Sequence, residues 1–474
     1  MIFSTVEFAF FFPVVFLLYW FVFKRNLRTQ NIFLIGASYF FYACWDWRFL
    51  GLIFLSSLID YLVGKQLGKI SDQALRKRWL FLSLVVNLGV LVYFKYANFF
   101  IGAFADTFTL FGTRLSGQTL NIILPVGISF YTFQTLSYTI DVYRNKMAPV
   151  QNAVPFFAYV SFFPQLVAGP IERATSLLPQ FNKSRIFSNE KATQGLQLIL
   201  IGLFKKMVIA DNCAIAVNTI FDNYTDYNGS TLFFGAVFFA FQIYGDFSGY
   251  SDIAIGTAKL LGFDLMKNFD MPYLSRNMGE FWRRWHISLS TWFRDYVYIP
   301  LGGSKYGNLR HFRNILIVFL LSGLWHGANY TFVVWGLVHA FFFIPLVVFK
   351  KHKTYLNYHN TKLFPDIRTS IQILITFTLV CLAWVFFRAT NITEALQYLN
   401  KIFSMSLLET PKVSRILVIG LFGYMVLEWI QRNKEHILVM PKLPKPLRYL
   451  VYYVIIFTVI YYSAETQPFI YFQF

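Results

Sequence analysis

The sequence is poor in charged residues, and in acidic residues above all. Charged residues make up 14% of its 474 residues, with 23 Asp and Glu against 42 Lys and Arg, whereas soluble proteins carry about 25% charge. Hydrophobic residues make up 56% and aromatic residues 20%, and the mean hydropathy is +0.50. This composition excludes a soluble globular protein and indicates a multi-pass membrane protein. No Gly-, Ser- or Pro-rich linker and no internal repeat divides the sequence, so we expect one integral membrane domain over residues 1–474.

Cysteine is also scarce. Cys44, Cys213 and Cys381 are far apart and lack the spacing of metal ligands, so we expect no disulfide framework, no metal and no bound cofactor. The net charge of +19 would point to nucleic acid in a soluble protein. Here Lys and Arg cluster in short loops between apolar runs, as the positive-inside rule describes. We therefore expect contact with membrane lipid and none with nucleic acid.

The apolar runs predict an all-α polytopic fold, because a spanning helix needs about 20 apolar residues. Several runs are shorter or longer than one span, so we expect roughly ten to thirteen membrane helices, some of them broken or re-entrant. The candidate runs lie near residues 7–23, 31–46, 49–64, 79–95, 97–112, 121–140, 153–169, 194–211, 231–261, 315–349, 370–387, 414–430 and 449–463.

Basic loops predict the orientation of these helices. Lys and Arg follow the first and third runs, which places those loops in the cytoplasm and the N-terminus outside. The basic loop 431–448 precedes a single last run, so we expect the C-terminus outside as well. The loop 222–226 carries no Lys or Arg and is the best candidate for an external loop.

The segment 276–313 differs from the apolar runs because basic residues alternate with Trp, Phe and Tyr. On one helix, Phe281, Trp285 and Leu289 would share a face, which is typical of a basic amphipathic helix lying in the membrane interface. Its arginines are candidates for steering an anionic donor, because guanidinium groups match phosphate geometry. The alternative is an anchor that only contacts anionic lipid. The candidate donor-binding residues are Arg283, Arg284 and Arg294.

His326 lies inside the run 315–349, and a titratable side chain at membrane depth indicates a functional residue. The alternative is a structural histidine, hydrogen-bonded between helices. Too few residues separate Arg313 from Lys350 for two full crossings of about 20 residues each and a turn. We therefore expect a re-entrant or broken hairpin that bends at 322–323 or 327–329 and holds His326 in a cavity; one long tilted helix is the alternative.

A neutral imidazole is the usual general base near neutral pH. His286, 40 residues before His326, could line the same tunnel. No Gly-x-Ser-x-Gly, phosphate-binding or His-Glu-x-x-His motif is present, which disfavours a serine hydrolase, an ATP-driven pump and a zinc protease. Of the other histidines, we expect His339 to be a packed core residue. We expect the remaining four to be solvated or interfacial: His311, His352, His359 and His436.

Seven stretches in order along the chain carry a resemblance to a known family. They are PVGISFYTFQ (125–134), FPQLVAGPI (163–171), DFSGYSD (246–252), EFWRRWHISL (280–289), YIPLGG (298–303), GLWHG (323–327) and FIYFQF (469–474). Each stretch alone is weak, whereas the ordered set is specific. Through this set the chain resembles the membrane-bound O-acyltransferases (MBOAT), in the bacterial branch that contains the membrane subunits of alginate and peptidoglycan O-acetyltransferases.

The resemblance implies a ring of tilted helices, with re-entrant and interfacial helices, around a central tunnel in a bacterial cytoplasmic membrane. It makes His326 the catalytic residue and His286 a second functional residue in the tunnel. It implies a cytoplasmic donor, acetyl-CoA or in a related branch an aminoacyl carrier protein. A tyrosine hydroxyl can carry an acyl group as an ester, and Tyr471 matches the tyrosine thought to do so in related systems. The alternative for this aromatic terminal stretch is a plug in the tunnel exit or a place in the interfacial belt.

These observations favour an acyltransferase that moves an acetyl group outward to O-acetylate an extracytoplasmic cell-envelope polysaccharide. The resemblance also implies an extracytoplasmic partner related to SGNH hydrolases, and the acceptor polymer stays open among alginate, peptidoglycan, a capsular glycan and cellulose. One alternative is D-alanyl transfer to teichoic acid. A transporter would be supported by matching interrupted helices in two halves, which the sequence does not show. The third alternative is a scaffold that recruits an envelope enzyme.

Overall fold

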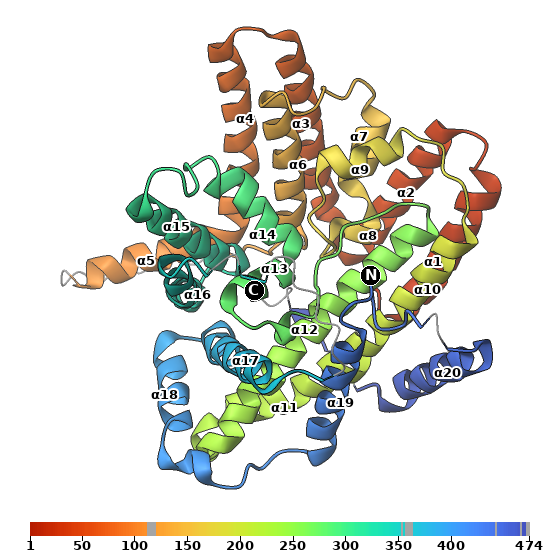
Figure 1. Cartoon of the computed structure of the whole chain (residues 1–474). Helices are drawn as coiled ribbons and strands as arrows, with labels where there is room; N and C mark the ends of the chain where they lie inside the picture. Colours follow the sequence, from red (N-terminus) through yellow and green to blue (C-terminus); the bar gives the residue numbers. More distant parts are fainter. Residues whose placement is uncertain (111–119, 352–353, 356–363, 441–442, 465–466, 471–474) are drawn as a thin grey trace. The chain divides into compact units, whose positions relative to one another are not determined.

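We analysed a computed structural model of the chain (Figure 1), which describes residues 1–110, 120–351, 354–355, 364–440, 443–464 and 467–470. Regular structure within these ranges is helical throughout, without a strand, which confirms the all-α prediction. Five helical stretches in the same ranges are long and apolar enough to cross a membrane. They are Leu27–Lys69, Gln73–Phe108, Gly229–Leu260, Tyr330–Val348 and Ile367–Arg388. The larger number of roughly ten to thirteen spans stays a prediction.

The chain divides into two compact units. The first comprises Met1–Leu196 and Ala254–Met266, and the second comprises Gln197–Ile253 and Lys267–Phe474. Two long helices therefore begin in one unit and end in the other. They are α10 (Asn189–Leu203) and α12 (Gly229–Leu260). Whether residues 1–474 act as one membrane domain stays a prediction.

The first unit has a polar group at its centre. Asp60 on α3 is fully buried and accepts hydrogen bonds from Ser83 and Asn87 on α4 and from Thr139 on α6. These donors offset the cost of removing the carboxylate from water. The other helices of this unit are α1 (Val6–Leu17), α2 (Leu27–Asp46), α5 (Ala97–Leu110), α7 (Ala153–Ser161), α8 (Phe163–Leu166) and α9 (Ala174–Phe181). Asp60 lies within α3 (Leu50–Lys69), α4 (Gln73–Leu91) and α6 (Ile128–Tyr143).

Two apolar runs of the first unit do not form the helices that their length predicts. The run 121–140 becomes helical only from Ile128, and α6 is buried along nearly its whole length. The run 153–169 breaks at Phe162 into α7 and α8, with Pro164 in the first turn of α8. Proline favours a helix start and disrupts a helix interior. Apolar length alone therefore did not separate buried core helices from spans.

The second unit contains most of the remaining helices. They are α11 (Asp211–Asp222), α13 (Met278–Arg284), α14 (Ile287–Phe293), α15 (Asn308–His326), α16 (Tyr330–Val348), α17 (Ile367–Arg388), α18 (Ile392–Ile402), α19 (Arg415–Gln431) and α20 (Lys445–Tyr462). Figure 1 shows α15 and α16 side by side, joined by a short turn. The predicted bend at 327–329 is confirmed, and the alternative of one long helix is wrong.

Small residues let α15 and α16 approach closely. A Cβ atom on Gly323 would overlap the backbone oxygen of Phe332, and one on Gly336 would overlap that of Phe319. A glycine of each helix thus lies directly against the backbone of the other helix, as in tightly packed membrane helix pairs. This contact fixes the end of α15, where His326 is the last residue.

The segment 276–313 is not one interfacial helix, so that prediction is wrong. Helix α13 ends at Arg284 and α14 begins at Ile287, because His286 between them has φ of +43° in the left-handed region. Phe281, Trp285 and Leu289 are buried, with exposures of 1%, 0% and 2%. Their apolar side chains therefore pack inside the protein instead of facing lipid.

Candidate active site

The structure brings His286 and His326 together. Their ring centroids lie 6.4 Å apart, and the residues are 1% and 3% exposed. His326 comes from the end of α15 and His286 from the break before α14. This separation agrees with the prediction that both histidines line one tunnel, whereas the tunnel itself and their chemical roles stay predictions.

Aromatic rings enclose His326. Trp325, Trp335 and Phe387 have ring centroids 5.0, 5.2 and 5.2 Å from the imidazole, each in an edge-to-face arrangement. Trp325 also lies 5.7 Å from the ring of His286, so it borders both histidines. A wall of this kind keeps bulk water away from the imidazole.

Asn268 sets the tautomer of His286. Its side-chain oxygen accepts hydrogen bonds from the backbone and hydroxyl of Ser288, at 3.3 and 2.9 Å, while its amide nitrogen donates to Ser251 at 3.2 Å. The same oxygen lies 3.2 Å from Nδ1 of His286. Because that oxygen can only accept, the neutral imidazole carries its proton on Nδ1. Nε2 then bears the lone pair and is the atom that can take a proton.

Burial keeps His286 neutral. Removal from water lowers the pKa of its imidazole to about 3, because the charged form loses its hydration. Phe247 stands edge-to-face against the ring, with 4.6 Å between centroids. A neutral imidazole of fixed tautomer suits a hydrogen-bonding partner at neutral pH, whereas a pKa this low makes it a weak general base.

The predicted donor-binding arginines differ in their surroundings. Arg284 forms a salt bridge of 2.9 Å with Glu280, which also binds Arg276. Arg283 donates to the backbone oxygen of Thr354 at 2.9 Å. Arg294 is exposed and pairs with its neighbour Asp295 at 2.7 Å. Arg284 therefore belongs to a structural network, and all three arginines stay predicted donor contacts.

Tyr471 lies outside the described residues, but the four residues that precede it are described. Phe469 is 1% exposed, and its ring lies 4.9 Å from Tyr250 and 6.2 Å from Phe247. Phe247 also contacts His286. Its ring therefore lies between segment 467–470 and the histidine pair.

The structure describes three of the five remaining histidines, and all three are buried. His339 is fully buried between Trp282 and Trp335, at 4.9 and 4.7 Å, which confirms a packed core residue. His311 and His436 are 8% and 7% exposed, so they are not solvated, and an interfacial position stays a prediction. Both are covered by the packing of their helices and loops, which sequence spacing does not show. His352 and His359 lie outside the described residues.

Sequence reasoning missed two groups of polar residues. Asn268 lies in a loop without a recognisable motif, and only the fold shows that it contacts His286. Lys206 forms salt bridges with Asp211 and Asp246, at 2.8 and 2.9 Å, inside the second unit. Asp246 begins the stretch 246–252, so the signal for this second group was present in the sequence.

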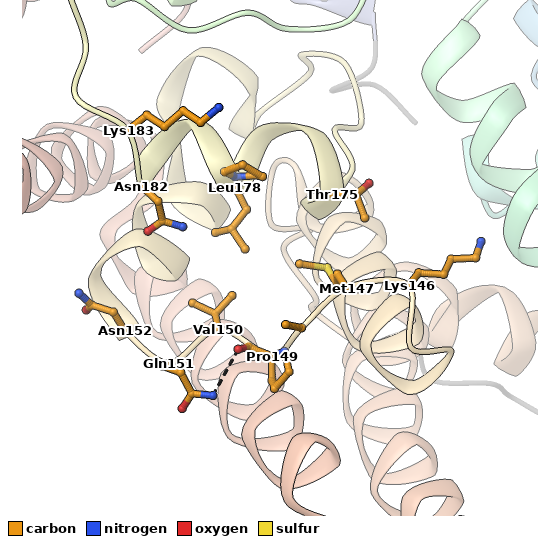
Figure 2. Close-up of a pocket in the computed structure, with 12 residues that line it drawn as sticks. Lys146, Met147, Pro149, Val150, Gln151, Asn152, Thr175, Leu178, Asn182 and Lys183 are labelled. Atoms are coloured by element: carbon orange, nitrogen blue, oxygen red, sulfur yellow. Dashed lines mark hydrogen bonds between the residues drawn. The ribbon is translucent and has the colours of Figure 1, made fainter.

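A cavity in the first unit is lined by none of these residues (Figure 2). It has a volume of about 710 Å³ and lies between the loop 146–152 and α9, with Lys146 and Lys183 among its lining residues. Leu178 and Val150 supply part of its apolar lining. Its lining holds neither a histidine nor a carboxylate, and its ionisable side chains are those of Lys146 and Lys183.

Comparison with known proteins identifies the family. The model of the membrane-bound O-acyltransferase family matches residues 32–389, a range that contains both His286 and His326. The chain belongs to the membrane-bound O-acyltransferase family. It is therefore an acyltransferase and a multi-pass membrane protein, which favours the enzyme over the transporter and the scaffold.

Individual relatives agree with this family. The chain is 39% identical over 432 residues to a probable alginate O-acetylase of Pseudomonas aeruginosa, across 91% of this chain and 80% of the relative. It is 38% identical over 430 residues to a peptidoglycan O-acetyltransferase of Helicobacter pylori, across 84% and 79%. A teichoic acid D-alanyltransferase of Bacillus subtilis is 28% identical over 287 residues, across 56% and 69%. The family members most similar among these three are O-acetylating enzymes.

Proposed function

We propose that this acyltransferase moves an acetyl group from cytoplasmic acetyl-CoA across the membrane to hydroxyl groups of an extracytoplasmic cell-envelope polysaccharide. The observation that carries the proposal is the buried pair of His286 and His326, 6.4 Å apart, with the tautomer of His286 set by Asn268. The relatives named for alginate and peptidoglycan O-acetylation supply the substrate class. D-alanyl transfer to teichoic acid is the alternative within the family.

In the proposed reaction, His326 removes the proton from an acceptor hydroxyl. The oxygen attacks the carbonyl carbon of the thioester, a new C–O ester bond forms and the C–S bond breaks. The departing sulfur takes up the proton from the imidazolium, so His326 ends the cycle neutral. Neutral His286 lies beside His326 and offers Nε2, which bears a lone pair, as a hydrogen-bond acceptor.

The first acceptor in this proposal is the hydroxyl of Tyr471, which directly follows segment 467–470. A second transfer of the same kind moves the acetyl group from the tyrosine ester to the polymer, with the aid of an extracytoplasmic partner related to SGNH hydrolases. The chain lies in a bacterial cytoplasmic membrane, with both termini outside. Arg283 and Arg294 steer the anionic donor at the cytoplasmic side.

Reconstituted vesicles test the proposal. His326→Gln should abolish transfer from radiolabelled acetyl-CoA while the circular dichroism spectrum stays that of the wild type. The matched control is His436→Gln, another buried histidine, which should retain activity. Full activity of His326→Gln would show that His326 is not the catalytic base. Activity of the wild type only with an aminoacylated carrier protein would favour D-alanyl transfer.

Tyr471→Phe tests the relay separately, because it removes only the hydroxyl oxygen. We expect loss of polymer acetylation, and in the wild type an added acetyl mass on the peptide containing Tyr471. Wild-type acetylation by Tyr471→Phe would exclude the relay and leave the role of His326 intact.

A further inference from the structure

Lys206 lies at the centre of a buried charge cluster in the second unit. Its ammonium group contacts carboxylate oxygens of Asp211 and Asp246 at 2.8 and 2.9 Å. All three side chains are at most 6% exposed. Asp246 is midway along α12, one of the five stretches able to cross a membrane. Charged groups at such a position are costly, and they persist mainly where function requires them.

The local backbone brings these charges together. Lys206 belongs to η4 (Phe204–Ala210), a π-helical segment, and such segments frequently occur at functional sites. Gly202 and Gly249 let the neighbouring helices touch, since a Cβ atom on either would lie 2.6 or 2.7 Å from the backbone oxygen of the other. This close approach brings Asp246 within reach of Lys206.

The cluster also binds the backbone of segment 467–470. The ammonium group of Lys206 donates to the carbonyl oxygen of Gln467 at 3.0 Å. The backbone N–H of Ile470 donates to Oδ2 of Asp246 at 2.7 Å. One lysine against two aspartates leaves excess negative charge, and the N–H of Ile470 offsets part of it. Since buried carboxylates need such donors, segment and cluster stabilise each other.

The bound segment reaches the histidine pair through aromatic contacts. Phe469, between the two anchored residues, packs on Tyr250 and Phe247, and Phe247 packs on His286. Asp246, Phe247 and Tyr250 all belong to α12. A shift of segment 467–470 would therefore change the surroundings of His286 directly.

We propose that Lys206 and Asp246 are positioning residues that clamp segment 467–470 beside the histidine pair and so fix the path of the chain that leads to Tyr471. The proposal rests on the proposed function and adds to it a device that orients the acceptor. Neither residue takes part in bond making. The clamp sets the rate at which a hydroxyl from this end of the chain meets the donor thioester, and it leaves donor binding unchanged.

Lys205 provides a matched control. It is the preceding residue of η4 and pairs with Asp252 at 2.7 Å, also on α12. Lys205→Met therefore removes a partly buried salt bridge between the same two helices without removing either hydrogen bond to segment 467–470. Both variants lose one lysine and keep a side chain of similar length.

The experiment combines hydrogen–deuterium exchange with kinetics in reconstituted vesicles. In Lys206→Met we expect amide exchange in residues 467–470 at least about tenfold faster than in the wild type. We also expect kcat to fall about 10- to 100-fold while KM for acetyl-CoA stays constant, because a positioning residue affects the reacting geometry and not donor binding. Lys205→Met should leave exchange in this segment as in the wild type.

A second pair of variants covers the case in which Lys206→Met does not fold. Ile470→Pro removes the N–H that binds Asp246 and fixes φ at this residue, whereas Ile470→Val keeps the N–H. Ile470→Pro should reproduce the lower kcat, and Ile470→Val should not. Unchanged exchange in Lys206→Met, or equal kcat in the two Ile470 variants, would overturn the clamp. His326→Gln separates the two proposals, because it should lose activity with normal exchange in residues 467–470.

Discussion

Nδ1 of His286 lies 3.2 Å from the side-chain oxygen of Asn268, an oxygen that already accepts two hydrogen bonds from Ser288. This contact decides which ring nitrogen of His286 carries the proton. It also couples the histidine pair to a loop residue that has no chemistry of its own.

Asn268→Leu should lower kcat about 10- to 100-fold, the range typical of partners that orient a functional histidine. The leucine occupies a similar volume but leaves Nδ1 without its acceptor, so the tautomer and ring orientation are lost. Ser251→Ala is the control, since Ser251 contacts only the amide nitrogen of Asn268. Equal activity of the Asn268→Leu variant and the wild type would show that this tautomer is unimportant.

Asn268→Asp should give an activity that depends on pH. A carboxylate beside Nδ1 favours the imidazolium and raises the pKa of His286 from its low value of about 3. A protonated His286 cannot accept a proton, so the rate should fall as pH decreases and recover as pH increases. In initial acetyl-transfer rates, the acid limb of Asn268→Asp should lie at a higher pH than any acid limb of the wild type.

Glu172 should make the protein less stable as pH rises. Burial raises the pKa of its carboxyl to about 7 from an ordinary value of 4.5, against the lowering effect of the hydrogen bond from the Met266 backbone. The folded protein therefore holds a proton that the unfolded chain releases between these pH values. The protonated carboxyl of Glu172 thus contributes on the order of 3 kcal/mol to the free energy of unfolding below pH 4.5. This contribution is lost as pH rises through 7.

Thermal melts in detergent at pH 5 and pH 8 measure this effect. Glu172→Gln, a neutral side chain of the same shape, should remove the pH-dependent part and raise Tm relative to the wild type at pH 8. The control is Glu190→Gln on the exposed first turn of α10. Parallel pH dependences of Tm for Glu172→Gln and the wild type would contradict the prediction.

Substitution of the glycines between α15 and α16 by a larger residue should destabilise the protein. Gly323→Ala or Gly336→Ala forces a Cβ atom against the backbone oxygen of the facing helix, and we expect a loss of about 1–3 kcal/mol together with lower activity, because His326 moves. Gly420→Ala on α19 meets open space and should leave Tm equal to or above that of the wild type. Equal Tm values for all three variants would argue against the close contact.

The predicted donor arginines should separate into two groups. Arg284→Met breaks the network with Glu280 and should lower Tm. Arg294→Met removes an exposed charge and should raise KM for acetyl-CoA, with a smaller salt dependence than in the wild type. An unchanged KM at low and high salt would assign Arg294 to lipid contact instead.

The sequence predicted the helical class, the bend after His326 and the proximity of two histidines, because these depend on apolar length, small residues and recognisable motifs. It did not predict the break at His286, since a left-handed histidine has no distinctive pattern around it. Asn268 and Lys206 were missed for a related reason. Their roles depend on contacts between residues far apart in the chain, such as the 224 residues between Asp246 and Ile470.

The residues of the clamp are synthesised at very different times. At about 5–20 residues per second, the ribosome needs on the order of 10 to 45 s to travel from Asp246 to Ile470, which are 224 residues apart. Throughout that interval Asp246 lacks the backbone donor that the mature protein gives it. The nascent second unit therefore carries a poorly compensated carboxylate into the membrane and completes its packing only after residues 467–470 have emerged. Truncated chains that end before residue 467 would keep Asp246 without this donor.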